Sequence, residues 1–86
     1  MSETDADLRS RKYAKDQADA ARAAAKQSLI DEANEAKQKM AALSGFINST
    51  GYGTVTEHQQ GLLRVQLVNI QSYWQVLQQR LKDWDK

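Results

Sequence analysis

A row of polar and amphipathic side chains is the part of this sequence best suited to ligand chemistry. Gln66, Tyr73 and Arg80 recur every seven residues, so they stack along one side of a helix. Arginine binds phosphate through two parallel hydrogen bonds, and a tyrosine ring stacks on a nucleobase. The row therefore predicts a ligand cleft between subunits for a molecule of nucleotide type. The candidate ligand-binding residues are Arg64, Gln66, Asn69, Tyr73, Arg80 and Tyr52.

A second interpretation of the same row stays open. Long amphipathic side chains beside an apolar seam often cover the edge of a core and form hydrogen bonds across an interface. In that case Tyr73 and Arg80 are structural residues, and the row is only a polar border.

Catalytic and metal chemistry have little support in this sequence. The chain contains no cysteine and a single histidine, His58, which follows Glu57 in a predicted first helical turn. Asp31, Glu32 and Glu35 form a surface patch without metal-ligand spacing, and no strand precedes the glycines as a phosphate-binding loop requires. We therefore expect a non-enzymatic protein without a metal or cofactor.

The composition limits the classes of partner. The formal net charge is only +1, whereas a nucleic-acid-binding domain usually has a marked basic excess. No apolar run approaches the roughly twenty residues that span a bilayer. The N-terminus is acidic, whereas a signal peptide begins with basic and then apolar residues. We expect no membrane partner and no nucleic-acid partner.

The organising element is the stretch from Thr56 to Trp84, which carries a stripe of large apolar residues. Its members alternate in steps of four and three, the spacing of a coiled-coil seam. The seam residues are Leu63, Leu67, Ile70, Trp74, Leu77, Leu81 and Trp84. Thr56 followed by Gln59 predicts the N-cap, although Thr54 followed by Glu57 offers the same pattern two residues earlier.

A longer alanine-rich helix is predicted to precede it, from about Thr4 to Ile47. Ser2, Thr4, Asp5 and Asp7 supply capping groups and first-turn acids. Its seam continues the same spacing through Leu29, Ala33, Ala36, Met40, Leu43 and Ile47. Upstream, Ala14, Ala18, Ala21 and Ala25 keep the spacing until an extra residue shifts the seam before Leu29.

A polar turn at residues 48–55 joins the two helices, and its glycines permit positive φ. So short a connection predicts an all-α, antiparallel helical hairpin at residues 21–86, with coiled-coil-like packing. The first helix is the longer one, so residues 1–20 form an overhang. Ala33 and Ala36 are expected to face Trp74 and Leu77, which lets the helices approach closely.

Self-association is predicted from the same pattern. A chain of 86 residues is near the size at which a single core is marginal, and no disulfide can add stability. Apolar residues also lie off the main stripe, at Leu62, Val65, Val68 and Val76. We therefore expect a homo-oligomer, with the overhang crossing a neighbouring subunit.

The segment from Ala33 to Trp84 resembles a family of short helical-hairpin proteins, mostly of unassigned function, that recur in tailed-phage genomes. The resemblance is carried by residues 39–47 (Lys-Met-Ala-Ala-Leu-Ser-Gly-Phe-Ile), a short polar turn, residues 62–67 (Leu-Leu-Arg-Val-Gln-Leu), and Ile70, Tyr73, Leu77, Arg80 and Leu81. Ile70 departs from the methionine that the family often has, and the N-terminal extension is longer. The resemblance implies a phage protein in the host cytoplasm, and it supplies no catalytic residues.

Three functional classes follow for such a protein. We expect a counter-defence sponge that sequesters a nucleotide-type immune signal, such as a cyclic nucleotide or an ADP-ribose-type molecule, at an oligomer interface. The alternatives are a protein-interaction module that binds a host protein, and a phage assembly accessory.

Overall fold

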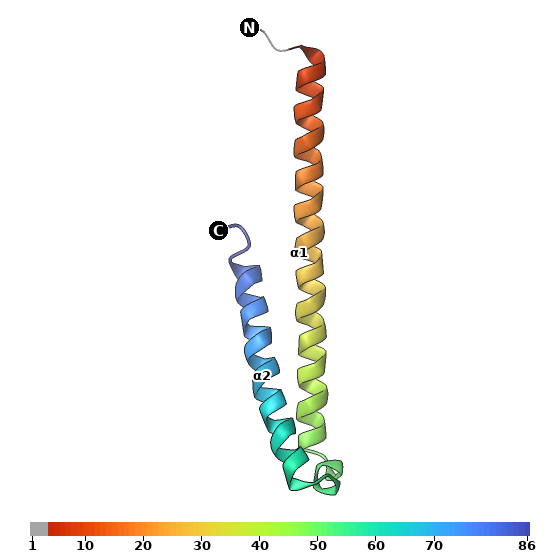
Figure 1. The fold of residues 1–86 in the computed structure, drawn as a ribbon, viewed down its shortest axis with the longest axis vertical. Coiled ribbons are helices and arrows are strands. Elements are labelled where there is room, and N and C mark those ends of the chain that lie inside the picture. The colour runs from red at the N-terminus through yellow and green to blue at the C-terminus, as the bar shows by residue number, and fades with distance from the viewer. Residues whose placement is uncertain (1–3) are drawn as a thin grey trace.

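Two helices lie side by side and run in opposite directions (Figure 1). The computed structural model describes residues 4–86. Within them, α1 spans Asp5–Ile47, a short 3-10 helix η1 spans Thr50–Thr54, and α2 spans Glu57–Lys82. The predicted all-α hairpin, with a long first helix and a shorter second one, is confirmed. Its packing in a homo-oligomer stays a prediction.

The start of α1 follows from local capping chemistry. The Thr4 hydroxyl accepts a hydrogen bond from the Asp7 backbone amide at 3.2 Å, which satisfies one of the free donors of the first turn. Asp5 and Asp7 place negative charge beside the positive end of the helix dipole. Ser2, also predicted as a capping residue, lies outside the described residues.

The connection between the helices resolves the uncertainty about where α2 begins. The Thr56 hydroxyl caps α2 by accepting from the Gln59 amide at 3.2 Å. Thr54 instead donates its hydroxyl hydrogen bond to the Gly51 carbonyl at 2.6 Å, within η1. The turn is closed by Gln60, whose side-chain amide donates to the carbonyls of Tyr52 and Val55.

The glycines do not use the positive φ that their lack of a side chain permits. No glycine in residues 4–86 has positive φ, because the chain turns through a 3-10 helix rather than a left-handed residue. Gly51 is the glycine in the turn at which a side chain would press on a neighbour. A Cβ atom at this position would lie 3.1 Å from Cε2 of Phe46, so the ring packs against the bare backbone.

The core follows the predicted seam. Leu29, Ala33, Ala36 and Leu77 are buried, and Ile70, Trp74, Leu81 and Trp84 pack against them. The remaining seam residues are half-buried, namely Met40, Leu43, Ile47, Leu63 and Leu67. The small side chains of Ala33 and Ala36 let the bulky side chains of α2 come close, as the alanine spacing predicts.

The N-terminal part of α1 extends beyond α2 (Figure 1). From Thr4 to Ser28 every residue is exposed, including the four alanines of the upstream repeat. Contact with the C-terminal end of the chain is made at Arg22. The division into an overhang at residues 1–20 and a hairpin at 21–86 stays a prediction. The first three overhang residues lie outside the described part.

The molecule is therefore extended. It measures 76 × 19 × 17 Å along its principal axes, with a Cα radius of gyration of 22.1 Å. A compact domain of this length has a radius of gyration of about 12 Å. Neither described helix is long and apolar enough to cross a membrane.

Candidate functional site

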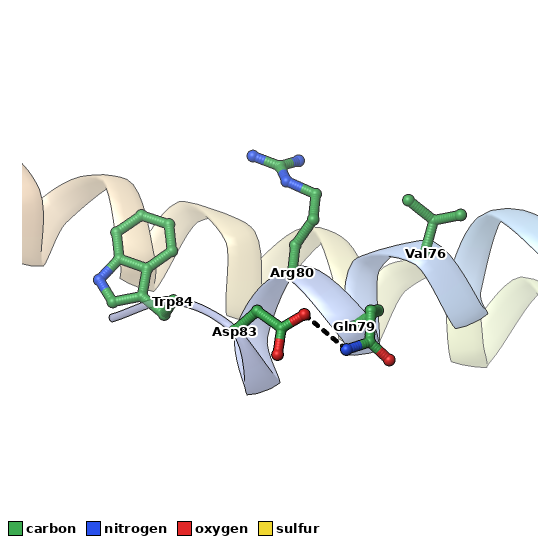
Figure 2. A pocket seen from close by; sticks show the side chains of 5 residues that line it. All are labelled: Val76, Gln79, Arg80, Asp83 and Trp84. Atoms are coloured by element: carbon green, nitrogen blue, oxygen red, sulfur yellow. Dashed lines mark hydrogen bonds between the residues drawn. The ribbon is translucent and has the colours of Figure 1, made fainter. Parts of the chain in front are cut away.

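An open pocket lies on the last turns of α2 and around the residues that follow (Figure 2). Val76, Gln79, Arg80, Asp83 and Trp84 line a volume of about 380 Å³. Residues 76, 79, 80 and 83 share one side of α2 because they are three or four apart. Arg80 and Val76 project to the same side, and the Trp84 ring lies on the far side of Arg80 from Val76. The pocket thus combines a cation, a carboxylate, an amide, an aliphatic surface and an indole.

The charge of Arg80 is not neutralised inside this pocket. Gln79 donates a hydrogen bond from Nε2 to Oδ2 of Asp83 at 2.6 Å, the contact drawn dashed in Figure 2. Oδ1 of the same carboxylate lies 3.2 Å from the Lys86 ammonium. Asp83 is therefore engaged by two other side chains. Within residues 4–86 Arg80 has no hydrogen-bond or ion-pair partner, so its guanidinium is free to receive an anion.

Trp84 is fixed by the other arginine at this end of the hairpin. The Arg22 guanidinium lies 5.6 Å from the centroid of the indole, a cation–π contact. Its Nη2 also donates to the Trp84 carbonyl at 3.2 Å and to Oδ1 of Asp85 at 2.8 Å. Trp84 lines both the Arg80 pocket and a second hollow that contains Arg22. The Arg22 contacts thus position the wall of the Arg80 pocket.

The two tyrosines of the predicted ligand set are already engaged within the chain. The Tyr73 hydroxyl, on α2, donates to Oε1 of Glu32 on α1. The Tyr52 hydroxyl donates to the Gln60 carbonyl at 3.1 Å, and Gln60 returns a bond to the Tyr52 carbonyl. Both tyrosines therefore help to hold the hairpin together.

A single chain does not gather the predicted ligand residues into one cavity. Arg64 and Asn69 are exposed on α2, and Arg64 lies about 24 Å from Arg80 along the helix axis. Gln66 lines a different hollow of about 310 Å³ between the two helices. The other residues of that hollow are Lys39, Ala42, Leu43, Phe46, Leu63 and Ile70. Of the predicted set, only Arg80 belongs to the Arg80 pocket.

Sequence reasoning missed several residues of this pocket. Gln79 and Asp83 were not singled out, although both are three residues from another pocket member. Trp84 was predicted as a seam residue, and it packs against the core, but it was not predicted to line a pocket. The Arg22–Trp84 contact had a usable signal, because positions 22 and 84 are at similar distances from the turn. In an antiparallel hairpin such positions lie side by side.

The residues considered for catalysis and metal binding lie apart or have other partners. His58 is exposed on the first turn of α2. Asp31 accepts a hydrogen bond from Gln27 at 3.0 Å, and Glu32 accepts from Tyr73. Among residues 4–86 no three His, Cys, Asp or Glu side chains are grouped as metal ligands.

Fold and pocket together define a two-helix hairpin protein with a candidate binding site. A sequence profile of the Sequestin family matches residues 23–83, well over half of the chain. The chain therefore belongs to the Sequestin family. The family name denotes sequestering, which is a binding role rather than a catalytic one. No curated protein and no solved structure matches the chain significantly.

The matched stretch overlaps most of the segment that carries the phage resemblance. It contains Tyr73, Arg80 and Asp83, and it ends one residue before Trp84. The phage origin itself stays a prediction.

Proposed function

We propose that this chain sequesters a small anionic molecule of nucleotide type and performs no reaction on it. The observation that carries the proposal is the unpaired Arg80 guanidinium beside the Trp84 indole, in a member of a family named for sequestering. Following the phage resemblance, the proposed role is counter-defence in an infected bacterium, where the ligand is an immune signal.

The pocket has complementary groups for the two halves of a nucleotide. The planar guanidinium of Arg80 can bind two phosphate oxygens at once, an arrangement that lysine cannot reproduce. Base stacking on an aromatic side chain contributes about 1–3 kcal/mol, and Trp84 supplies an indole held by Arg22. The sequence-based proposal assigned stacking to Tyr73 or Tyr52; Trp84 is better placed beside Arg80.

The proposed site lies at an interface between copies. In one chain the pocket is an open hollow on α2 and the residues that follow it, with no wall from α1. Ligand pockets normally enclose most of the surface of a small molecule. A second copy that covers α2 would supply the missing wall.

A protein partner is the alternative that a specific observation favours. Leu62, Val65, Val68 and Val76 are between 49% and 59% exposed on α2. Exposed apolar residues on one helix are typical of a surface that binds another helix. A host protein that this surface blocks, or a phage assembly in which it is an accessory, would use the same residues.

A thermal-shift panel on the purified protein separates these functions. It should include cyclic dinucleotides, cyclic trinucleotides and ADP-ribose derivatives, each at 10 µM. A ligand with a sub-micromolar Kd should stabilise the protein by at least about 1.4 kcal/mol, a shift of several degrees for a chain of this size. A flat panel would contradict the proposal, and the host-protein alternative would then be tested by pull-down.

Arg80→Ala tests the site within the same panel, with Arg64→Ala as the matched control. Both arginines are exposed on α2 and have no partner within residues 4–86, so neither change should alter the melting temperature of the free protein. The ligand-induced shift should disappear in Arg80→Ala and persist in Arg64→Ala. A lower melting temperature of ligand-free Arg80→Ala would instead show that Arg80 is structural.

A further inference from the structure

One side of α2, next to the seam that meets α1, carries a second set of apolar residues. We call it the outer face and define it by Leu62, Val65, Asn69, Tyr73 and Val76. The side chains of Leu62, Val65, Tyr73 and Val76 are 49%, 57%, 45% and 57% exposed. The core seam takes other positions of the same helix, among them Ile70 and Leu77. Within residues 4–86, the apolar side chains of the outer face stay about half exposed, and Tyr73 donates its hydroxyl hydrogen bond to Glu32 of α1.

The outer face is symmetric along the helix. Leu62 and Val76 are each seven residues from Asn69, and Val65 and Tyr73 are each four residues from it. A two-fold interface requires this property, because each residue i of one copy then meets residue j of the other. We propose that a second copy of this chain packs antiparallel on the outer face, with the two-fold axis at Asn69.

The register follows directly from the symmetry. Leu62 of one copy faces Val76 of the other, and Val65 faces Tyr73. Asn69 of one copy faces Asn69 of the other, so the two carboxamides can pair by hydrogen bonds. A single polar residue in an apolar helix interface is known to select one register over its neighbours. The nearby Ser72 is already satisfied, since its hydroxyl donates to the Val68 carbonyl at 3.2 Å.

Charge favours the antiparallel direction over the parallel one. Arg80 lies at one end of this side of α2, so a parallel pair would place two guanidinium groups together. In the antiparallel pair they are separated by 22 helical residues, about 33 Å, and no longer repel each other. The positive N-terminus of each α2 dipole also lies near the negative C-terminus of the other.

The second copy completes the Arg80 pocket. Val76 belongs both to the outer face and to the pocket lining. In this register, the N-terminal turns of the other α2, around His58 and Leu62, lie over Val76 and Arg80. The open hollow thereby becomes a cleft with walls from two chains, and each dimer has two such clefts. This inference rests on the proposed function, which places the ligand between copies, and adds the face and the register.

Disulfide trapping tests the register, because the chain has no cysteine and each variant carries a single thiol. Asn69→Cys should form a covalent dimer under mild oxidation, since positions at a two-fold axis lie close enough for a disulfide. Leu62→Cys alone and Val76→Cys alone should not form covalent dimers. In this register the two thiols of either variant, one in each copy, lie about 21 Å apart along the axis, beyond disulfide range. An equimolar mixture of these two variants should form the mixed dimer.

Gln71→Cys is the matched control for collisions in solution. Gln71 and Asn69 are both exposed. Because two residues turn the helix by about 200°, Gln71 lies on nearly the opposite side of α2. We expect at least a tenfold slower disulfide formation than for Asn69→Cys. Equal rates for these two variants would overturn the interface. Faster self-trapping of Val76→Cys than of Asn69→Cys would also overturn it, in favour of a parallel pair.

The thermal-shift panel and the disulfide trapping test the binding function and the outer-face dimer independently. An Arg80-dependent thermal shift together with failed trapping would overturn the outer-face dimer and leave the binding function standing. Specific trapping at Asn69 together with a flat panel would uphold the dimer and contradict the nucleotide ligand.

Discussion

Polar side chains on this hairpin differ mainly in whether the chain itself provides their partner. Arg22 is held by an indole, a carbonyl and a carboxylate, while Arg80 has none of these. Tyr73 is held by Glu32 across the helix pair. A charged group without a partner keeps its full capacity to bind an anion, whereas an engaged one must first give up its contact. This contrast supports the proposal that Arg80 binds the ligand.

Tyr73→Phe tests the structural role of Tyr73. The ring is kept and only the hydroxyl is lost, so the change removes the hydrogen bond to Glu32 without altering packing. Because the side chain is 45% exposed, we expect a loss of about 0.5–1 kcal/mol in the free energy of unfolding. Urea unfolding followed by circular dichroism measures this directly.

Tyr13→Phe is the control for that measurement. The Tyr13 hydroxyl accepts from Gln17 at 2.7 Å within one helix, in the exposed part of α1, so its loss should leave stability within error. If Tyr73→Phe is as stable as the wild type but fails to respond to a ligand, Tyr73 belongs to the binding site instead.

At the scale of elements, local rules account for what the sequence predicts well. The seam from Leu63 to Trp84 predicts which side of α2 meets α1, because helical periodicity acts within a few residues. The Thr56 cap follows in the same way. The 3-10 helix and the stacking of Phe46 on Gly51 were not predicted, because they depend on how the two helices converge. A glycine in a turn often adopts positive φ, but Gly51 does not; instead its lack of a side chain lets the Phe46 ring pack against it.

Gly51→Ala tests that steric role against Gly53→Ala. Alanine at a compatible backbone conformation usually stabilises a protein by about 0.4–1 kcal/mol, because the unfolded chain loses freedom. A Cβ atom at Gly53 would meet no atom within 4 Å beyond its chain neighbours, so Gly53→Ala should show this gain. At Gly51 the Phe46 ring must move, so we expect the free energy of unfolding of Gly51→Ala to be about 1 kcal/mol lower than that of Gly53→Ala.

Thermal melting of the two variants, measured side by side, should differ by several degrees. Equal melting temperatures would mean that the Phe46 ring moves away without cost, and that Gly51 is not required by the turn.

The candidate site was predicted only in part, for a reason of distance. Arg80 was identified because the capacity of an arginine to bind anions follows from its residue type alone. The place of Trp84 in the pocket was not predicted, because it depends on Arg22, more than sixty residues earlier in the chain. Of the predicted set, Gln66, Asn69, Tyr73 and Arg80 share a side of α2. They extend too far along the helix axis for one small molecule. Sequence periodicity reports the direction of side chains and does not report how far apart they lie.

At the scale of the whole molecule, the hairpin has little core for its length. Four described residues are buried in a body 76 Å long. Chains of this size usually need disulfides, a metal or association to remain folded, and this one has no cysteine. Its stability should therefore depend on its own concentration.

Dilution provides the test. A dimer that unfolds to two separate chains loses about 2.7 kcal/mol over a hundredfold dilution, because each factor of ten is worth about 1.4 kcal/mol. From 100 µM to 1 µM the melting temperature, followed by circular dichroism, should fall by roughly 5–10 °C. The Asn69→Cys variant, once oxidised to the covalent dimer, should melt at the same temperature at both concentrations, because its two chains no longer separate. A wild-type melting temperature that is unchanged over this range, together with a monomeric mass by light scattering, would show that the hairpin is stable alone.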